Sequence, residues 1–426
     1  MSKLSDSKKY IVVLADQSGE AEIQAAQQAL NCSLTHSQEL GSSLRAKQVY
    51  DQGKGVFFQH LGTAVVDDVE LERLEAAVRS DSPIIHFEAE RQFRPVGPLE
   101  QLASIKETLA SLQRQVDELE ASLTSPIEPE PPISRPSTWG LGAMELTSTS
   151  LTGKGVAVAV LDTGLFLDHP DFSDLNVSGR SFVDGEEWDR DLNGHGTHCA
   201  GTLCGDKSDQ NGRYYSVAPQ VDLYVGQVLD RAGNGLTSGL LDGIDWALSQ
   251  GCRIISLSLG AEVRPGARPS PLFERVGKRA LERNCLIIAA AGNESRRSQR
   301  PPKPVNSPAD AQSIMAVAAL NRRLRVADFS NAGVNAQTGG GVDIAAPGVD
   351  IYSAFSQLAP GGSLYRSQNG TSMAVPHVAG LAALYIQQFP DILAGMLWQK
   401  LAETAQPIEG QDAIDVGNGL ARLQIN

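Results

Sequence analysis

From about residue 137 to the end, the chain alternates short apolar runs with longer amphipathic stretches. Runs of four to six residues, rich in valine, isoleucine and alanine, are typical of strands buried on both faces. They fall at 156–161, 223–228, 254–259, 286–290, 314–318 and 342–345, with helical stretches such as 240–250 and 272–283 between them. This alternation predicts an α/β fold, a parallel sheet with helices on both faces.

The first part of the chain shows a different pattern. Apolar runs predict strands at 10–15, 55–60, 63–66 and 83–88, and helical spacing predicts helices at 21–30 and 71–78. The order β-α-β-(β)-α-β fits a ferredoxin-like α+β sandwich. Some other small α+β domain is the alternative.

A heptad pattern follows at residues 99–123. Apolar residues step by three and four, at Leu102, Ile105, Leu109, Leu112, Val116, Leu119 and Leu123. Such a helix could pair two chains, or it could lie along another domain of the same chain. A proline-rich stretch at 125–136 then predicts an extended, solvated linker. We therefore expect a small domain at 1–97, a heptad helix with its linker at 98–136, and a large domain at 137–426.

Composition narrows the class of protein. The 426 residues have a formal net charge of −14, which argues against nucleic-acid binding. No stretch approaches the roughly 20 apolar residues of a membrane helix, and the first residues lack the apolar core of a signal peptide. Five cysteines form an odd set without CxxC spacing, as expected for free thiols. We expect a cytoplasmic protein that binds neither nucleic acid nor membrane, with leaderless export as the alternative.

Polar residues at the ends of the apolar runs suggest chemistry. Asp162 follows the first run, His195 lies in a glycine-rich segment, and Asn293 follows the fourth run. Ser372 follows a glycine turn and begins an apolar helix, where free N–H groups and the helix dipole favour negative charge. Taken singly, each is more often a turn or cap residue. Together they suggest nucleophilic catalysis by a serine.

Five motifs resemble those of the subtilisin-like serine protease (subtilase) family, which has the same Asp–His–Ser order. They are VLDTG at 160–164, HGTHCAGT at 195–202, AAGN at 290–293, AAPG at 345–348 and GTSMAVPHVAG at 370–380. The resemblance spans about residues 137–424. It implies a serine endopeptidase that needs no cofactor for its chemistry. A non-catalytic peptide-binding protein on the same scaffold is the alternative, and the filled catalytic positions argue against it.

The resemblance also implies a role for each residue. Ser372 would be the nucleophile, His195 the general base and acid, and Asp162 the residue that orients His195. Asn293 and the Ser372 N–H would form the oxyanion hole. His198 and His377 would be structural, and Cys199 a buried inert thiol.

An extended substrate would lie as a strand between two segments of the enzyme. The matching substrate-binding residues are Gly233, Asn234 and Gly235 on one side, Ser258, Leu259 and Gly260 on the other, and Ala290 and Gly292 in the primary pocket. The insertion 295–307, with three arginines and a lysine, could favour acidic substrate residues. It could equally be a solvated basic loop. Glu294, being acidic, would disfavour acidic substrate residues.

Two further features follow from the resemblance. Asp171 resembles a calcium ligand of the family, and the loop 206–211 has oxygen ligands that could complete a structural calcium site. That loop also holds a lysine and departs from the family pattern, so a site without calcium is the alternative. The domain at 1–97 resembles a propeptide that inhibits the enzyme by placing its tail in the cleft, so the enzyme would be a zymogen. The heptad helix and linker depart from the family pattern. The cleavage point could therefore lie near residues 90–98 or within 124–138, or the chain could stay uncleaved.

Overall fold

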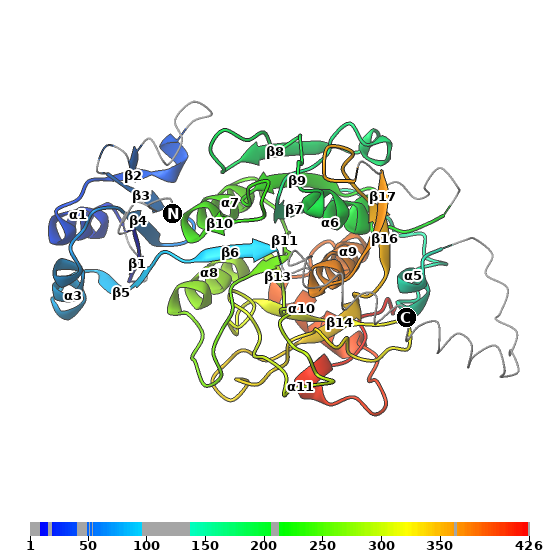
Figure 1. Ribbon diagram of the computed structural model, residues 1–426. Helices are drawn as coiled ribbons and strands as arrows, with labels where there is room; N and C mark the ends of the chain where they lie inside the picture. Colours follow the sequence, from blue (N-terminus) through cyan, green and yellow to red (C-terminus); the bar gives the residue numbers. More distant parts are fainter. Residues whose placement is uncertain are drawn as a thin grey trace, which may run out of the picture.

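The computed structural model describes residues 9–15, 19–40, 49–50, 52, 54–95, 137–205, 213–361 and 364–424. The predicted heptad helix, the proline-rich linker and the candidate calcium loop at 206–211 lie outside these residues. In Figure 1 the N-terminal α+β domain lies at the left, beside the larger α/β domain.

The larger domain is built on a parallel sheet of seven strands, as the apolar runs predicted. Strand β13, Leu286–Ala290, is fully buried, because helices cover both faces of the sheet. In order across the sheet the strands are β15 (Ile344–Pro347), β14 (Met315–Leu320), β13, β11 (Ile254–Leu257), β7 (Ala157–Asp162), β9 (Asp222–Gln227) and β8 (Val177–Ser181).

Two helices at the centre of this domain carry motif residues of the sequence analysis. Helix α9, Thr371–Gln388, is buried from its first residue to Ile386 and packs on β11, β13, β14 and β15. Helix α6, His195–Cys204, is entirely buried and packs against α9 and β7. Other elements are α5 (Trp139–Ala143), η2 (Pro170–Phe172), α7 (Thr237–Ser249), α8 (Pro271–Glu282), α10 (Ala394–Thr404), α11 (Ala413–Val416) and the hairpin of β16 (Ile351–Ala354) and β17 (Tyr365–Gln368).

The N-terminal domain has the predicted order of strands and helices, with one additional strand. Its sheet runs β2 (Leu34–His36), β3 (Gly55–Phe58), β4 (Thr63–Val66), β1 (Tyr10–Leu14) and β5 (Ile84–Ala89). Helices α1 (Glu20–Leu30) and α3 (Leu71–Arg79) cover one face, where Ile23 and Leu74 pack with Val12 and Phe57. The short η1 (Ser37–Glu39) follows β2.

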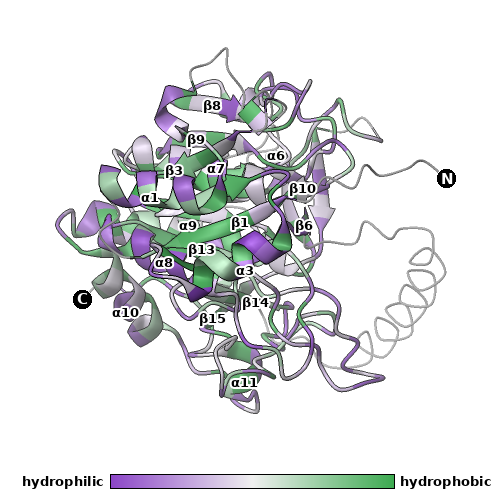
Figure 2. Ribbon diagram, turned by 90° about the vertical axis from the view of Figure 1, so that its left-hand side faces the viewer, coloured by the Kyte–Doolittle hydropathy of each residue, from purple (hydrophilic) through white to green (hydrophobic). Residues whose placement is uncertain are grey.

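The other face of this small sheet packs against the larger domain. Alternate residues of its strands, among them Ile11, Val13 and Phe58, join the core of the larger domain. Strands β1 and β5 contact α8, and β3 contacts α7. Figure 2 shows apolar green strands in the interior, with more polar ribbon around them.

A third, short sheet joins the two domains. Strand β6, Gln92–Pro95, lies between β10, Gly235–Leu236, and β12, Leu259–Gly260, and is antiparallel to both. The predicted single strand at 254–259 is therefore two strands, because the chain leaves the main sheet at Ser258 and pairs with β6 instead. Among the described helices, none is long and apolar enough to cross a membrane.

Candidate active site

The predicted chemical residues meet at one edge of the large sheet. Asp162 is the last residue of β7, Ser258 directly follows β11, and Asn293 lies shortly after β13. These three strands are neighbours and parallel, so their carboxyl ends lie together. His195 is the first residue of α6 and Ser372 the second residue of α9.

Asp162 and His195 form a buried pair. Nδ1 of His195 donates to Oδ1 of Asp162 at 2.7 Å, and the two side chains are 6% and 1% exposed. Burial disfavours the charged imidazole, but the Asp162 carboxylate and the Cys199 thiol together outweigh it and hold the pKa of His195 well above its usual value. Nε2 of His195 is buried and has no hydrogen-bond partner among the residues that the structure describes. The Asp162 bond therefore orients the ring and leaves Nε2 to exchange a proton.

Glycine sets the backbone just before this histidine. Gly194 has φ +91°, and an added Cβ would overlap the Phe355 ring. Any other residue would be strained there and would clash. The glycine lets the chain turn sharply into α6.

Ser372 lies fully buried at the start of α9. Its Oγ donates to the Ser258 carbonyl at 2.9 Å, and the Ser258 Oγ donates back to the Ser372 carbonyl at 2.8 Å. Cys199 joins the two helices, since its Sγ lies 3.6 Å from the Ser372 carbonyl and 3.9 Å from Nδ1 of His195. Serine and histidine thus lie around one buried thiol.

Asn293 is held by the residue before the serine. Its Oδ1 accepts from the Thr371 N–H at 2.9 Å and from the Thr371 Oγ1 at 3.0 Å. These bonds fix the orientation of the amide and assign Nδ2 as its donor. The Ser372 N–H lies in the first turn of α9, where no earlier carbonyl of the helix can accept from it. Both groups suit an oxyanion.

Asp191 is a site residue that the sequence analysis missed. It is fully buried, and its two oxygens accept from the Thr163 and Thr197 hydroxyls and from three N–H groups, including that of Gly194 at 2.8 Å. Burial raises its pKa. Asp191 therefore ties the chain after Asp162 to the turn before the histidine helix. An aspartate in a polar loop gives no sequence signal for such a role.

Two other histidines of the motifs are buried and bound to backbone, as the resemblance implied. Nε2 of His198 donates to the carbonyls of Ile351 at 2.9 Å and Arg366 at 3.0 Å, and burial lowers its pKa to about 3. Nδ1 of His377 donates to the Met373 carbonyl at 2.8 Å, and burial lowers its pKa to about 4. Both stay neutral and hold helices in place. Cys199 is likewise fully buried, and burial raises its pKa.

The predicted substrate segments contact strand β6. Gly235 pairs with Phe93, and Leu259 and Gly260 pair with Pro95 and Arg94. The Asn234 Oδ1 accepts from the Gln92 side chain at 3.1 Å. Gly233 instead lies in the preceding turn, where its N–H donates to the Asp230 carbonyl. Ala290 and Gly292 lie beside Asn293, at the end of β13.

The basic insertion is partly turned away from the cleft. Nη1 of Arg297 donates to Asp415 of α11 at 2.5 Å. Glu294, in contrast, is held near the oxyanion residue, because its Oε2 accepts from Asn331 at 2.7 Å and from Asn306 at 3.0 Å. Burial raises the pKa of Glu294.

The expected calcium ligand has other partners. Oδ1 of Asp171 accepts from the Tyr365 hydroxyl at 2.9 Å, and Oδ2 accepts from the Tyr215 hydroxyl. Calcium takes six to eight oxygen ligands, and Asp171 has no other carboxylate, imidazole or thiol in a metal-sized group among the described residues. The one such group there is Asp162, His195 and Cys199. The described surroundings of Asp171 do not fit calcium.

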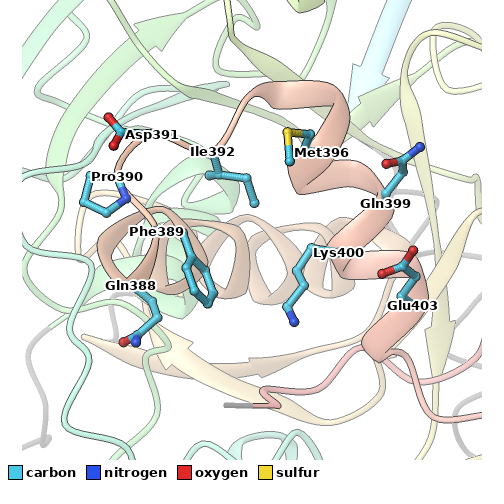
Figure 3. Close-up of a pocket in the computed structure, with 9 residues that line it drawn as sticks. All are labelled: Gln388, Phe389, Pro390, Asp391, Ile392, Met396, Gln399, Lys400 and Glu403. Atoms are coloured by element: carbon cyan, nitrogen blue, oxygen red, sulfur yellow. The ribbon is translucent and has the colours of Figure 1, made fainter. Parts of the chain in front are cut away.

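An apolar groove among the described residues lies away from the catalytic candidates. It has a volume of about 650 Å³ and is lined by residues such as Phe389, Ile392, Met396 and Lys400, between the end of α9 and helix α10 (Figure 3). Ser372 lies at the opposite end of α9, about 25 Å away along an 18-residue helix. The groove is therefore separate from the candidate active site.

Comparison with known proteins gives consistent matches. The model of the "Subtilase family" matches residues 153–421. Subtilisin Savinase of Lederbergia lenta is 38% identical over 290 residues, which are 67% of this chain and 97% of that protein. Subtilisin DY of Bacillus licheniformis is 35% identical over 272 residues, 64% of this chain and 90% of that protein. An intracellular serine protease of Paenibacillus polymyxa is 37% identical over 281 residues, 64% of this chain and 80% of that protein.

Proposed function

The chain belongs to the subtilase family and is a serine endopeptidase, and we propose that it is made as a zymogen inhibited by its own N-terminal domain. Its substrates are proteins or peptides, and subtilases need no cofactor for catalysis. The observation that supports the zymogen is strand β6, which belongs to the N-terminal part yet fills the space between β10 and β12.

We assign the chemistry to the buried cluster at the strand ends. The Ser372 Oγ attacks the carbonyl carbon of the substrate, and its proton passes to Nε2 of His195. The C–N bond then breaks, and the leaving amine takes that proton. Water hydrolyses the acyl-enzyme by the same route in reverse. The Asp162–His195 bond of 2.7 Å supports these roles, and so does the buried Nε2, which no described residue occupies.

Stabilisation of negative charge falls to Asn293 and the Ser372 N–H. As the tetrahedral intermediate forms, its oxyanion would accept from Nδ2 of Asn293 and from this backbone group. The two bonds from Thr371 to Oδ1 support this assignment, since they direct Nδ2 of Asn293 to the opposite side of the amide.

Strand β6 indicates how a substrate would bind. Main-chain pairing with β10 and β12 makes few demands on sequence, so affinity would come largely from the backbone. The Phe93 side chain is 1% exposed and packs edge-on against Phe273, with ring centroids 5.5 Å apart. An apolar side chain at this position of a substrate would be favoured.

Helix α7 of the larger domain binds the two residues that directly precede β6. The Thr237 N–H donates to the Arg91 carbonyl at 3.0 Å, and the Arg91 N–H donates to the Thr237 Oγ1 at 2.9 Å. The Glu90 carboxylate accepts from the Ser238 N–H at 3.1 Å, at the N-terminal end of α7, where the helix dipole favours negative charge. These bonds fix the register of the inhibitory strand.

Two further proposals concern the surroundings of the enzyme. The five cysteines are buried and form no disulfide, which supports a reducing, cytoplasmic location. Self-association through the heptad pattern at 99–123 is the second, and bracing of one domain by the same helix is its alternative. Binding to nucleic acid or membrane is not part of the proposal, given the net charge of −14.

An intact-mass time course of the purified full-length chain tests the zymogen. Pro95, the last residue of β6, pairs with Leu259 of β12. The residue before Leu259 is Ser258, whose carbonyl accepts from the Ser372 Oγ. The strand thus leads into the catalytic residues, so we expect self-cleavage shortly beyond Pro95. Ser372→Ala should abolish the cut, and Ser367→Ala, an exposed serine on β17, should not.

Other outcomes would contradict parts of the proposal. A first cut at 124–138 would mean that another segment occupies the cleft. An intact wild-type chain that reacts with a serine-directed probe would be an enzyme without self-processing. An intact chain that does not react would mean that β6 keeps the site blocked and that a separate step must activate the enzyme.

A further inference from the structure

Both carboxylate oxygens and the N–H of Asp171 are already bonded within the protein. The residue lies in η2 and is 7% exposed. Its two oxygens accept from the hydroxyls of Tyr365, at 2.9 Å, and Tyr215. Its N–H donates to Nδ1 of His169 at 3.1 Å. Asp171 is therefore a buried carboxylate satisfied by two phenols.

Aromatic rings pack around this carboxylate. Tyr352 stacks on Tyr365 with ring centroids 5.6 Å apart and an angle of 8°. Tyr215 meets both rings edge-on, at 6.0 and 6.2 Å, and His169 meets Tyr365 edge-on at 5.1 Å. Calcium needs six to eight oxygens at 2.3–2.6 Å. Among the described residues, the groups bonded to the Asp171 carboxylate are instead two tyrosine hydroxyls.

The two phenols act as hydrogen-bond donors to this carboxylate. Burial and the nearby Asp171 charge raise the pKa of Tyr215 well above its usual value. A neutral hydroxyl donates to a carboxylate, and charge-assisted bonds of this kind are among the stronger ones. The tyrosines thus supply the compensation that a buried carboxylate requires.

The cluster joins three separate parts of the chain. Asp171 and His169 precede β8, Tyr215 follows α6, and Tyr365 begins β17. Nε2 of His169 adds a bond to the Leu364 carbonyl at 2.8 Å. The same hairpin of β16 and β17 accepts both bonds from His198 of α6.

We propose that Asp171 is the acceptor of a metal-free Tyr215–Asp171–Tyr365 brace that fixes the β16–β17 hairpin, and that it is not a calcium ligand. The brace replaces the cation that the family resemblance implies at this position. This proposal does not depend on the zymogen, because it concerns the catalytic domain alone.

Thermal unfolding of the full-length Ser372→Ala chain, which is protected from self-cleavage, tests the brace. The variants are Asp171→Asn, Tyr365→Phe and the control Asp174→Asn, an exposed residue three positions away. Each is measured in calcium chloride and in EGTA. We expect Asp171→Asn and Tyr365→Phe to lower Tm by about 4 °C, equally in both conditions, and the control to change it by less than about 1 °C.

The outcomes separate a brace from a metal site. If calcium raises the Tm of the parent and the control but not that of Asp171→Asn, Asp171 is a ligand and the proposal is overturned. If calcium raises all four equally, it binds elsewhere and the brace is supported. If Tyr365→Phe leaves Tm unchanged in both conditions, the brace is overturned.

Terbium chloride gives a second measurement that needs no destabilised variant. Terbium occupies calcium sites, and tyrosines within a few ångströms sensitise its emission. A lanthanide on Asp171 would lie beside three tyrosine rings. We expect terbium emission sensitised by tyrosine to be the same in the parent and in Tyr365→Phe. Emission from the parent that calcium displaces, and that Tyr365→Phe lowers several-fold, would overturn the proposal.

Discussion

Thr371 couples the oxyanion residue to the start of the nucleophile's helix. Its N–H and Oγ1 both donate to Oδ1 of Asn293, and its Oγ1 accepts from the Gly292 N–H at 3.2 Å. The side chain is fully buried, so no water replaces these bonds. One hydroxyl therefore joins the end of β13 to α9 and sets the direction of the Asn293 amide.

Thr371→Val tests this coupling at the level of one atom. Valine keeps the shape and removes the hydroxyl, so Asn293 loses one of its two restraints and the Gly292 N–H loses its acceptor. We expect kcat to fall about fivefold with KM nearly unchanged, since a single hydrogen bond contributes about 1 kcal/mol. Steady-state hydrolysis of a peptide by the processed enzyme measures both constants.

Thr371→Ser is the matched control, because it keeps the hydroxyl and loses only a methyl group. It should retain most of the wild-type kcat. Equal kcat values for the valine and wild-type enzymes would mean that Asn293 is oriented without Thr371.

Helix α7 is the element on which the N-terminal domain lies. Oδ1 of Asp245 accepts from the N–H and Nδ1 of His60, both at 3.0 Å, and Oδ2 accepts from the Ser37 Oγ at 2.7 Å. Asp242 lies one turn earlier, 8% exposed, in a cavity of about 470 Å³ that Tyr50 and Arg180 also line. The cavity lies between the two domains.

Asp242 makes this contact sensitive to pH. Burial raises its pKa to about 7, the Arg180 charge opposes that shift, and Asp245 adds to it. When the N-terminal domain leaves, the carboxyl meets water and its pKa returns toward about 4. Between these values the docked form holds one more proton than the separated form. Docking therefore weakens as pH rises toward 7, by up to about tenfold per unit, and then levels off.

Size-exclusion chromatography of the cleaved protein at several pH values measures this effect. We expect the N-terminal fragment to stay bound at about pH 5 and to separate progressively toward about pH 8. Asp242→Asn should make the bound fraction nearly independent of pH, and the exposed control Asp174→Asn should behave as wild type. The prediction fails if Asp242→Asn keeps the wild-type pH dependence. Other charged groups at this cavity are Lys9, Asp184 and Asp230.

At the level of the whole molecule, the two domains share one core. The buried face of the N-terminal sheet and Phe93 of β6 belong to the same apolar cluster as the large sheet. Such an interface is held by apolar burial as well as by the β6 pairing. Cutting one peptide bond beyond β6 would leave all of these contacts intact.

Cleavage and activity should therefore be separated in time. We expect intact mass to show the cut before hydrolysis of a peptide substrate begins, because the cut N-terminal part still fills the cleft. A trace of mature enzyme should shorten this lag by degrading the inhibitor. Activity that rises in step with cleavage would show that β6 leaves the cleft at once.

The strands show that a local apolar pattern predicts where a strand forms but not which strand it pairs with. The apolar runs predicted the parallel sheet correctly, because a strand buried on both faces must be apolar along its whole length. Residues 254–259 look like one strand, but Ser258 divides them, because β12 pairs with β6 instead of the main sheet. Strand β6 has alternating exposure, a weak signal in four residues. Its pairing depends on segments about 140–165 residues away, which no local pattern specifies.

The sequence by itself determined the α/β class, the N-terminal α+β domain, the family and the residues that meet at the strand ends. These follow from local periodicity and from motifs whose order is fixed along the chain. Only the tertiary structure decided that Asp191 and Thr371 hold the site, and that Asp171 faces Tyr215 and Tyr365. A buried polar side chain is defined by its partners, and these partners come from other elements of the fold.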